Sequence, residues 1–187
     1  MLKRAFDILV SAFLLVVLSP LFLCCAALVR FGSPGPVFHI SKRVGRWNKF
    51  FLMPKFRSML VGTPQVATHL IQDPGSLLTP AGWFLRRSSL DELPQLWSVL
   101  CGDMSLVGPR PALFNQHDLM EERTKLGIHA LRPGITGWAQ INGRDEISLE
   151  RKVELDHYYL REASFLLDLK ILVSTLWKTS RSEGVSH

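Results

Sequence analysis

Residues 8–29 read ILVSAFLLVVLSPLFLCCAALV, an uncharged and almost wholly apolar run of 22 residues. A helix of that length is long enough to cross the hydrocarbon core of a bilayer. Ser19-Pro20 lies in the middle of the run, and a proline inside a helix removes a backbone hydrogen bond and bends the chain. Basic residues flank the run on both sides: Lys3 and Arg4 before it, and Arg30, Lys42, Arg43 and Arg46 after it. Because basic flanks stay in the cytoplasm, the pattern predicts a re-entrant membrane helix over residues 1–31, broken at Ser19-Pro20.

An ordinary spanning helix with a proline kink is the alternative to the re-entrant helix. It places basic residues on both faces of the membrane, against the charge rule. A cleaved signal peptide fits less well, because the run is long and no A-x-A site closes it. The remaining residues, 32–187, are then expected to form one catalytic domain at the cytoplasmic face of the membrane.

The composition sets broader limits on partners and compartment. The chain has 187 residues, 47% of them hydrophobic, which is enough for one core. Its 22 Lys and Arg against 16 Asp and Glu give a net charge of +6, which indicates an anionic partner such as lipid headgroups, a nucleotide or nucleic acid. The three Cys form no CxxC motif, which is typical of a reducing compartment. The six His show no metal-site spacing.

Two adjacent carboxylates mark the chemical centre of the sequence. Residues 86–96 read RRSSLDELPQL, so Asp91 and Glu92 follow two arginines and precede a proline. Ser89 with Glu92 fits a capping box, and Asp91 alone fits an N-cap with Pro94 in the first turn of the helix. Spacing alone leaves a capping role and a catalytic role equally supported. Under the catalytic interpretation, the carboxylates do chemistry on a phosphate and the arginines hold it.

Cations that suit a phosphate occur at three places along the chain. Lys55 and Arg57 would lie on one face of an extended stretch, with Phe56 between them facing inward. Arg86 precedes the carboxylate pair. Arg110 stands between two prolines in Gly108-Pro109-Arg110-Pro111, where a rigid backbone can aim a guanidinium whose planar fork bonds two phosphate oxygens. A solvated basic edge strand is the ordinary alternative for Lys55.

Residues 132–144, RPGITGWAQINGR, form a second polar, glycine-rich stretch. Its arginines can neutralise phosphates and its other polar side chains can bond a base or a sugar, which gives five candidates: Arg132, Thr136, Gln140, Asn142 and Arg144. The stretch is neither GxGxxG nor GxxxxGK[ST], so it predicts neither a Rossmann site nor a P-loop. A turn-rich loop with structural glycines remains the alternative.

The fold class predicted is α/β in a loose sense, a helix-dominated α+β domain with short strands. Segments 37–40 and 49–53 have strand character, and segment 60–80 is a turn-rich loop that could cover a substrate. Helices are expected over 81–87, 93–100, 113–125 and 148–161, with 113–125 charged and exposed. Segment 165–177 is too short to span and is either an interfacial amphipathic helix or a core helix. The anchor, the Trp83 region and 165–177 are expected to share one membrane-facing side.

Five motifs in order make the chain recognisable: KFRSM at 55–59, SLDELPQL at 89–96, GDMS at 102–105, GPRP at 108–111 and RPGITG at 132–137. Together they resemble the bacterial sugar transferase family, the monotopic polyprenyl-phosphate phosphoglycosyl transferases. The resemblance covers nearly the whole chain. It implies the minimal catalytic form, without a preceding bundle of spanning helices.

The resemblance implies an activity and the roles of several residues. Sugar 1-phosphate would move from a UDP-sugar to undecaprenyl phosphate with release of UMP, the first membrane step of surface glycan assembly. Asp91 would be the nucleophile, forming an aspartyl phosphosugar, and Glu92 would assist as a base or through Mg²⁺, the implied cofactor held by Asp91. The phosphate-handling cations would be Lys55, Arg86 and Arg110, and the broken anchor would be Ser19-Pro20. The implied location is the cytoplasmic face of the bacterial inner membrane.

Two other functions fit parts of the pattern. One is a membrane-anchored module that binds anions, for which a carboxylate pair among arginines has little use. The other is a Mg²⁺-dependent phosphohydrolase that uses the same aspartate. The resemblance implies no nucleic-acid partner, and the apolar helices suit a homodimer contact as well as a monomer. No residue indicates which UDP-sugar is used.

Overall fold

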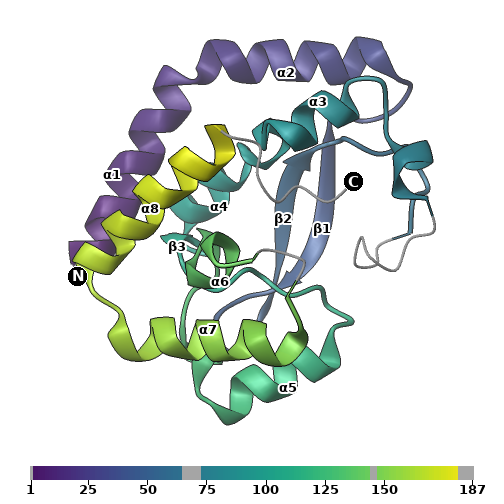
Figure 1. Cartoon of the computed structure of the whole chain (residues 1–187). Helices are drawn as coiled ribbons and strands as arrows, with labels where there is room; N and C mark the ends of the chain where they lie inside the picture. The colour runs from purple at the N-terminus through teal and green to yellow at the C-terminus, as the bar shows by residue number, and fades with distance from the viewer. Residues whose placement is uncertain (1, 65–72, 144–146, 181–187) are drawn as a thin grey trace.

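The computed structural model describes residues 2–64, 73–143 and 147–180 as a helix-rich fold with two small sheets (Figure 1). The helices are α1 (Leu2–Val17), α2 (Ser19–Gly32), α3 (Gly82–Arg87), α4 (Gln95–Cys101), α5 (His117–Lys125), α6 (Trp138–Ile141), α7 (Leu149–Glu162) and α8 (Phe165–Ser180). Short 3₁₀ turns are η1 (Arg46–Asn48), η3 (Pro74–Leu77), η4 (Leu90–Glu92) and η5 (Ile128–Ala130). The strands are β1 (Phe38–Val44), β2 (Phe50–Phe56), β3 (Ser105–Val107) and β4 (Gly134–Thr136). The predicted class, helices with a few short strands, is confirmed.

The apolar N-terminal run is broken where the sequence predicts. Helix α1 ends at Val17 and α2 begins at Ser19, with Pro20 in its first turn. The Ser19 hydroxyl donates to the Val16 carbonyl at 2.8 Å, which satisfies an oxygen near the break. Among the described residues no single helix meets the length and hydropathy needed to cross a bilayer, whereas α1 and α2 together do, bent by 64°. The bend is the geometry of a broken span or a re-entrant loop.

Polar residues at the start of α1 join it to the rest of the protein. Lys3 forms an ion pair with Asp168 of α8 at 2.7 Å, and Arg4 donates to the Val99 and Leu100 carbonyls at the end of α4 at 2.6 and 3.0 Å. Asp7, which is buried, accepts from the Ser105 hydroxyl at 2.9 Å and from the Leu106 amide at 3.1 Å. These charges therefore fix α1 to the domain, besides any part they have in membrane topology.

The two sheets hold the segments that carry the site. Strands β1 and β2 form an antiparallel hairpin in which Phe38 pairs with Phe56 and Val44 with Phe50. Strands β3 and β4 form a parallel pair. They lie so close that a Cβ at Gly134 would stand 2.1 Å from the Gly108 amide nitrogen, so the pairing requires glycine there. This contact brings the 108–111 and 132–137 motifs side by side.

Three apolar clusters form the core. The largest joins α4, β3, α7 and α8 through residues that include Val99, Met104 and Ile171. A second, containing Leu119 and Val153, lies between α5 and α7. In the third, Cys25 and Val29 of α2 pack against Phe56 and Leu85, so α2 rests on β2 and α3. Segment 165–177 is thus neither wholly interfacial nor wholly core, because one side of α8 is buried and the other is exposed.

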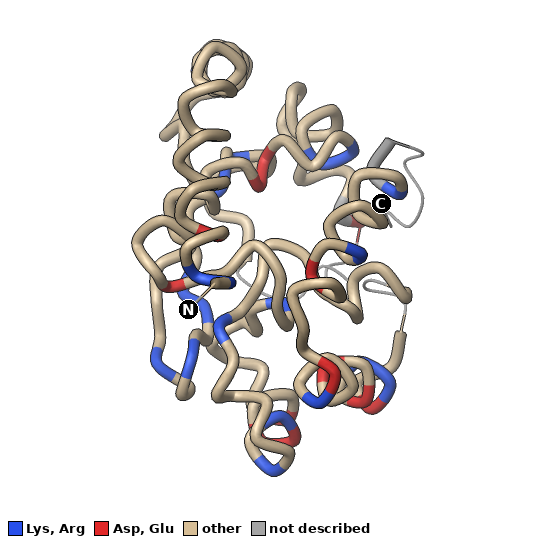
Figure 2. Tube along the Cα trace, turned by 90° about the vertical axis from the view of Figure 1, so that its left-hand side faces the viewer, with Lys and Arg blue, Asp and Glu red and all other residues tan. Residues whose placement is uncertain are grey.

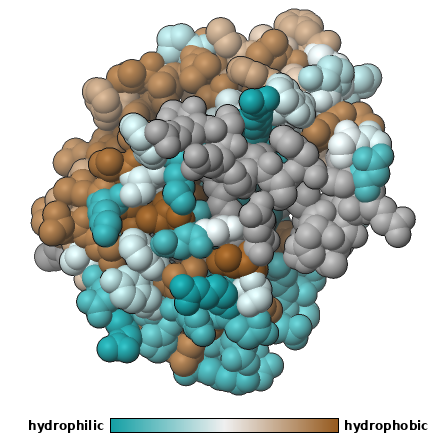
Figure 3. All heavy atoms as spheres, viewed as in Figure 1, coloured by the Kyte–Doolittle hydropathy of each residue, from teal (hydrophilic) through white to brown (hydrophobic). Residues whose placement is uncertain are grey.

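Exposed apolar side chains gather on the outer helices. Large exposed examples on α1, α2, α3 and α8 are Leu9, Phe13, Val16, Leu23, Phe31, Trp83, Phe84, Leu166, Val173, Leu176 and Trp177. Figure 3 shows this apolar surface along the top and left, over α1 and α2, while the lower part is hydrophilic. In Figure 2 the charged residues lie mostly away from the apolar length of α1 and α2. One side of the molecule therefore presents an exposed apolar surface of the kind that contacts a membrane or another protein.

Candidate active site

The carboxylate pair lies on a tight turn between α3 and α4. Ser89 adopts a left-handed conformation with φ of 57°, and Leu90–Glu92 form the 3₁₀ turn η4. The predicted capping roles are wrong: within the described chain no side chain caps η4 or α4, and α4 begins after Pro94. Asp91 and Glu92 therefore owe their positions to the turn and to tertiary contacts. Neither side chain caps a helix, so both are available for a catalytic role.

Glu92 is held by two cations from distant parts of the chain. Its Oε1 accepts from Lys55 Nζ of β2 at 2.6 Å and from Arg110 Nη2 at 3.2 Å. The Glu92 and Lys55 side chains are only 19% and 17% exposed. Arg86, in the last turn of α3, contacts the Met59 sulfur at 3.5 Å. The structure thus brings Lys55, Arg86 and Arg110 to one wall, together with both carboxylates.

The two neighbouring carboxyls have opposite electrostatics. Burial opposes ionisation of Glu92, but the charges and hydrogen bonds of Lys55 and Arg110 outweigh it and hold the Glu92 pKa well below its usual range. Burial raises the pKa of Asp91 to about 6, with a further rise from the charge on Glu92 and opposition from Lys55, Arg86 and Arg110. The Asp91 carboxylate accepts no side-chain hydrogen bond from the described residues. Glu92 is therefore a fixed anion, and Asp91 is a buried carboxylate with uncommitted oxygens.

These residues line a cavity of about 970 Å³. Its polar wall includes the two carboxylates and the three cations. Its apolar wall comes from α1, the break after α1, α4 and α8, through Val10, Leu14, Leu18, Leu96, Leu172 and Leu176. The volume exceeds what a single phosphate needs and falls at the upper end of small-molecule sites. A ligand with a charged head and an apolar body fits this division.

The glycine-rich stretch contributes only part of what the sequence suggested. Thr136 and Gln140 line the cavity, and both polar atoms of the Gln140 amide are buried without a hydrogen-bond partner among the described residues. Arg132 instead donates to the Gly102 carbonyl at 2.9 Å, and Asn142 donates to the Trp138 carbonyl at 2.8 Å. Neither is among the residues that line the cavity. Arg144 lies outside the described residues.

Two features near the site had no signal in the sequence. His39 of β1 pairs in register with Lys55 and lines the cavity, and burial, then Lys55 and Arg43, lower its pKa. Helix α5 was expected to be exposed, but its Arg123 is buried and bonds Asp156 of α7. An amphipathic pattern marks apolar positions on a helix, and it gives no sign that a charged residue on the same helix is buried in a pair.

Residues 1–182 match the bacterial sugar transferase family, so the chain belongs to that family. The match covers nearly the whole sequence, as the motif resemblance predicts. The carboxylate pair and its cations all lie within it.

Individual relatives place the chain more closely. It is 46% identical to the uncharacterized sugar transferase EpsL of Bacillus subtilis (strain 168), over the full chain and 91% of that protein. It is 45% identical to the UDP-glucose:undecaprenyl-phosphate glucose-1-phosphate transferase of Escherichia coli (strain K12), over 95% of this chain and 40% of that protein. It is 38% identical to the UDP-N-acetylgalactosamine-undecaprenyl-phosphate N-acetylgalactosaminephosphotransferase of Aeromonas hydrophila, over 94% of this chain and 43% of that protein. The chain thus spans less than half the length of these two transferases.

Proposed function

We propose that the protein transfers sugar 1-phosphate from a UDP-sugar to undecaprenyl phosphate and releases UMP. The observation that carries the proposal is the cavity itself, in which an uncommitted buried carboxylate faces three cations and an apolar wall. The relatives in Escherichia coli and Aeromonas hydrophila are named for this class of reaction. The product would be the lipid-linked sugar that begins assembly of a surface glycan.

Asp91 is the nucleophile in this proposal. An Asp91 oxygen attacks the phosphorus next to the sugar, the bond from that phosphorus to the bridging oxygen breaks, and UMP leaves with the bridging oxygen. A phosphate oxygen of the lipid then attacks the same phosphorus and releases Asp91. Burial favours Asp91 for this role, because a partly desolvated carboxylate is a stronger nucleophile than a solvated one. Glu92 suits it less, because its Oε1 is already bonded to Lys55 and Arg110.

The cations reduce the repulsion between a carboxylate and a diphosphate. Lys55 and Arg110 form ion pairs with Glu92, the residue next to the nucleophile, and Arg86 lines the same cavity. Fixed cations of this kind stabilise negative charge that develops on the transferred phosphoryl group and on UMP. Gln140 is proposed to bond the nucleotide or the sugar, because a buried amide without partners gains most from a polar ligand. Thr136, whose hydroxyl is bonded to the Thr175 hydroxyl at 2.7 Å, lines the same cavity and is proposed as a second contact.

The donor set also suits Mg²⁺, which we propose as cofactor. Mg²⁺ in phosphoryl-transfer sites typically takes one or two carboxylates, with substrate phosphate and water completing its shell. Asp91 and Glu92 supply two carboxylates, and among the described residues no cluster of three or more His, Cys, Asp or Glu offers a complete protein cage. The ion would neutralise charge on the diphosphate. Asp91 is the better ligand, because Glu92 Oε1 is occupied by Lys55 and Arg110.

The membrane supplies the second substrate. We propose that α1 and α2 enter the cytoplasmic face of the inner membrane as a re-entrant pair, with residues 32–187 at the interface. The 64° bend, the apolar outer surface and the basic flanks support this arrangement. Because α1 and α8 also line the cavity, a lipid phosphate could reach Asp91 from the membrane side.

The test is release of UMP by the purified protein in detergent or nanodiscs, with Mg²⁺, undecaprenyl phosphate and a panel of UDP-sugars. The proposal expects UMP and lipid-linked sugar in equal amounts with at least one donor. The Asp91→Asn variant should lose UMP release. Asp103→Asn, the same change at an exposed carboxyl, is the matched control and should keep it. Free sugar phosphate formed without lipid would instead identify a phosphohydrolase. Binding of UDP-sugars with no turnover of any of them would identify an anion-binding module.

A further inference from the structure

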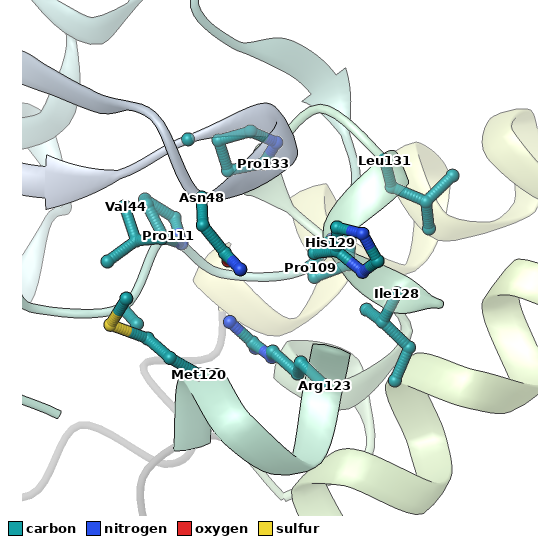
Figure 4. A pocket seen from close by; sticks show the side chains of 12 residues that line it. Val44, Asn48, Pro109, Pro111, Met120, Arg123, Ile128, His129, Leu131 and Pro133 are labelled. Atoms are coloured by element: carbon teal, nitrogen blue, oxygen red, sulfur yellow. The ribbon is translucent and has the colours of Figure 1, made fainter. Parts of the chain in front are cut away.

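Arg110 is bonded at both ends, by its side chain and by its own backbone. Its guanidinium donates to Glu92 Oε1 at 3.2 Å on the cavity side. Its carbonyl accepts from Arg123 Nη1 of α5 at 2.9 Å. Figure 4 shows Arg123 reaching from its helix toward the segment that carries Pro109 and Pro111. The two contacts lie on opposite sides of one short segment.

Arg123 is itself fixed by a buried partner. Its Nε and Nη2 donate to Asp156 Oδ2 of α7 at 3.0 and 2.5 Å. Arg123 is 8% exposed and Asp156 is 1% exposed. Neither residue is among those that line the large cavity, whereas Arg123 does line a small one of about 30 Å³ behind the segment. The contact that connects this pair to the site is therefore the hydrogen bond to the Arg110 carbonyl.

The backbone around Arg110 has few other freedoms. Prolines at 109 and 111 fix their own φ angles, and Pro111 also restricts Arg110 to extended conformations. On the far side of Pro111, the Ala112 carbonyl accepts from the Val44 amide of β1 at 2.9 Å. The bond from Arg123 fixes the peptide that remains, the one between Arg110 and Pro111. With it in place, the Cα–Cβ bond of Arg110 has a fixed direction, and from that starting point the side chain reaches Glu92 Oε1.

We propose that Arg123 and Asp156 are positioning residues that aim the Arg110 guanidinium at the reacting phosphate. A buried ion pair is often no better for stability than packed apolar residues, because both charges lose their hydration. Arg123 also donates from Nη1 to the Arg110 carbonyl. Apolar residues could fill the same space but could not form this hydrogen bond. The inference rests on the proposed function, in which Arg110 stabilises the diphosphate.

Loss of the pair would lower the rate by misplacing Arg110. Displacement of a catalytic group by about 1 Å can cost roughly 100-fold in rate. We expect Arg123→Gln to lower kcat by about 10- to 100-fold with little change in KM, because a charge that matters most in the transition state contributes little to binding of the ground state.

A double-mutant cycle tests this coupling. Arg110→Gln, Arg123→Gln and the double variant are assayed for UMP release with the same donor and lipid. If Arg123 acts through Arg110, its substitution costs nothing further once the Arg110 guanidinium is gone. Losses that multiply would overturn the inference and leave the role of Arg110 intact. Wild-type activity of Arg110→Gln alone would overturn the proposed role of Arg110, and the inference with it.

Two further variants separate positioning from stability. Val153→Ala, in the apolar cluster between the same two helices, lowers stability without touching the Arg110 carbonyl and should keep the wild-type kcat. Arg123→Lys keeps a cation beside Asp156 but lacks the fork that reaches the carbonyl, so we expect a folded protein with reduced kcat. Wild-type kcat for folded Arg123→Lys, or an equal loss for Val153→Ala at matched stability, would contradict positioning.

Discussion

Replacing Asp91 with asparagine should remove activity and raise stability together. Asp91 is 7% exposed, and burial raises the pKa of its carboxyl from an ordinary 3.8 to about 6. The difference between those values corresponds to about 3 kcal/mol of folding free energy lost at neutral pH, because the folded protein must ionise a carboxyl that burial disfavours. Asparagine has the same shape and carries no charge. For a chain of this size, about 3 kcal/mol corresponds to a rise of roughly 6 to 12 °C in Tm.

The pH dependence gives the prediction its sign. The folded pKa of Asp91 lies above the ordinary value, so the protonated carboxyl is favoured by folding. Its contribution is fully present below about pH 4 and is lost as the pH rises through about 6. The stability gap between Asp91→Asn and the wild type should therefore be largest above pH 7 and close as the pH falls toward 4.

The assay is thermal unfolding in detergent at several pH values between 4 and 8, with EDTA present because a bound cation would lower the Asp91 pKa. Exposed Asp103→Asn, the same chemical change at a solvated carboxyl, should move stability by no more than about 0.5 kcal/mol. UMP release by Asp91→Asn should fall by at least about 1,000-fold, as when other covalent nucleophiles are removed. Lower stability of Asp91→Asn at pH 7.5, or a gap that does not change with pH, would refute the electrostatic argument; substantial turnover would refute the nucleophile.

Three other perturbations follow from the same structure. The wild-type kcat/KM for UMP release, measured with Mg²⁺, should fall at a pH below 6, because Asp91 must be ionised to attack and a bound cation lowers its pKa from the metal-free value of about 6; a profile that stays flat down to pH 4 would contradict this. Asp168→Ala removes the nearer of two acceptors of the buried Tyr159 hydroxyl, 2.6 Å away against 3.4 Å for the Val107 carbonyl, and the ion-pair partner of Lys3. It should lower the free energy of unfolding by roughly 3 kcal/mol in a denaturant titration; a change within about 0.5 kcal/mol of wild type would contradict this. Gly134→Ala places a Cβ 2.1 Å from the Gly108 amide nitrogen and should disrupt the β3–β4 pairing; normal thermal unfolding of this variant would argue against the close contact.

Local sequence predicted the features that depend on neighbouring residues. The helix break at Ser19-Pro20 follows from the proline ring, and the strand character of segments 37–40 and 49–53 follows from their apolar residues; the structure pairs these segments as β1 and β2. The inward position of Phe56 follows from strand alternation, and it is 1% exposed. Each of these effects acts over a few residues, so a short window contains its cause.

Part of the candidate site could also be found from the sequence, because residue chemistry and motifs single out charged side chains. Lys55, Arg86 and Arg110 were selected as phosphate ligands and lie on the wall beside Asp91 and Glu92. The same reasoning could not separate Thr136 and Gln140, which reach the cavity, from Arg132, whose side chain bonds the Gly102 carbonyl instead. The direction in which a loop side chain points depends on tertiary packing. The spacing of residues along the sequence does not predict it.

The sequence by itself determined a broken apolar helix, a helix-rich domain with short strands, and an acidic pair among cations. Only the tertiary structure gave the two adjacent carboxyls different states. Glu92 is held ionised by Lys55 and Arg110, which are 37 and 18 residues away along the chain, while at Asp91 burial is the largest effect and the charge on Glu92 adds to it. Likewise, only folding placed Arg123 of α5 and Asp156 of α7 behind Arg110. The physical reason is that desolvation and Coulomb energy depend on distance in space, and segments far apart in sequence set that distance.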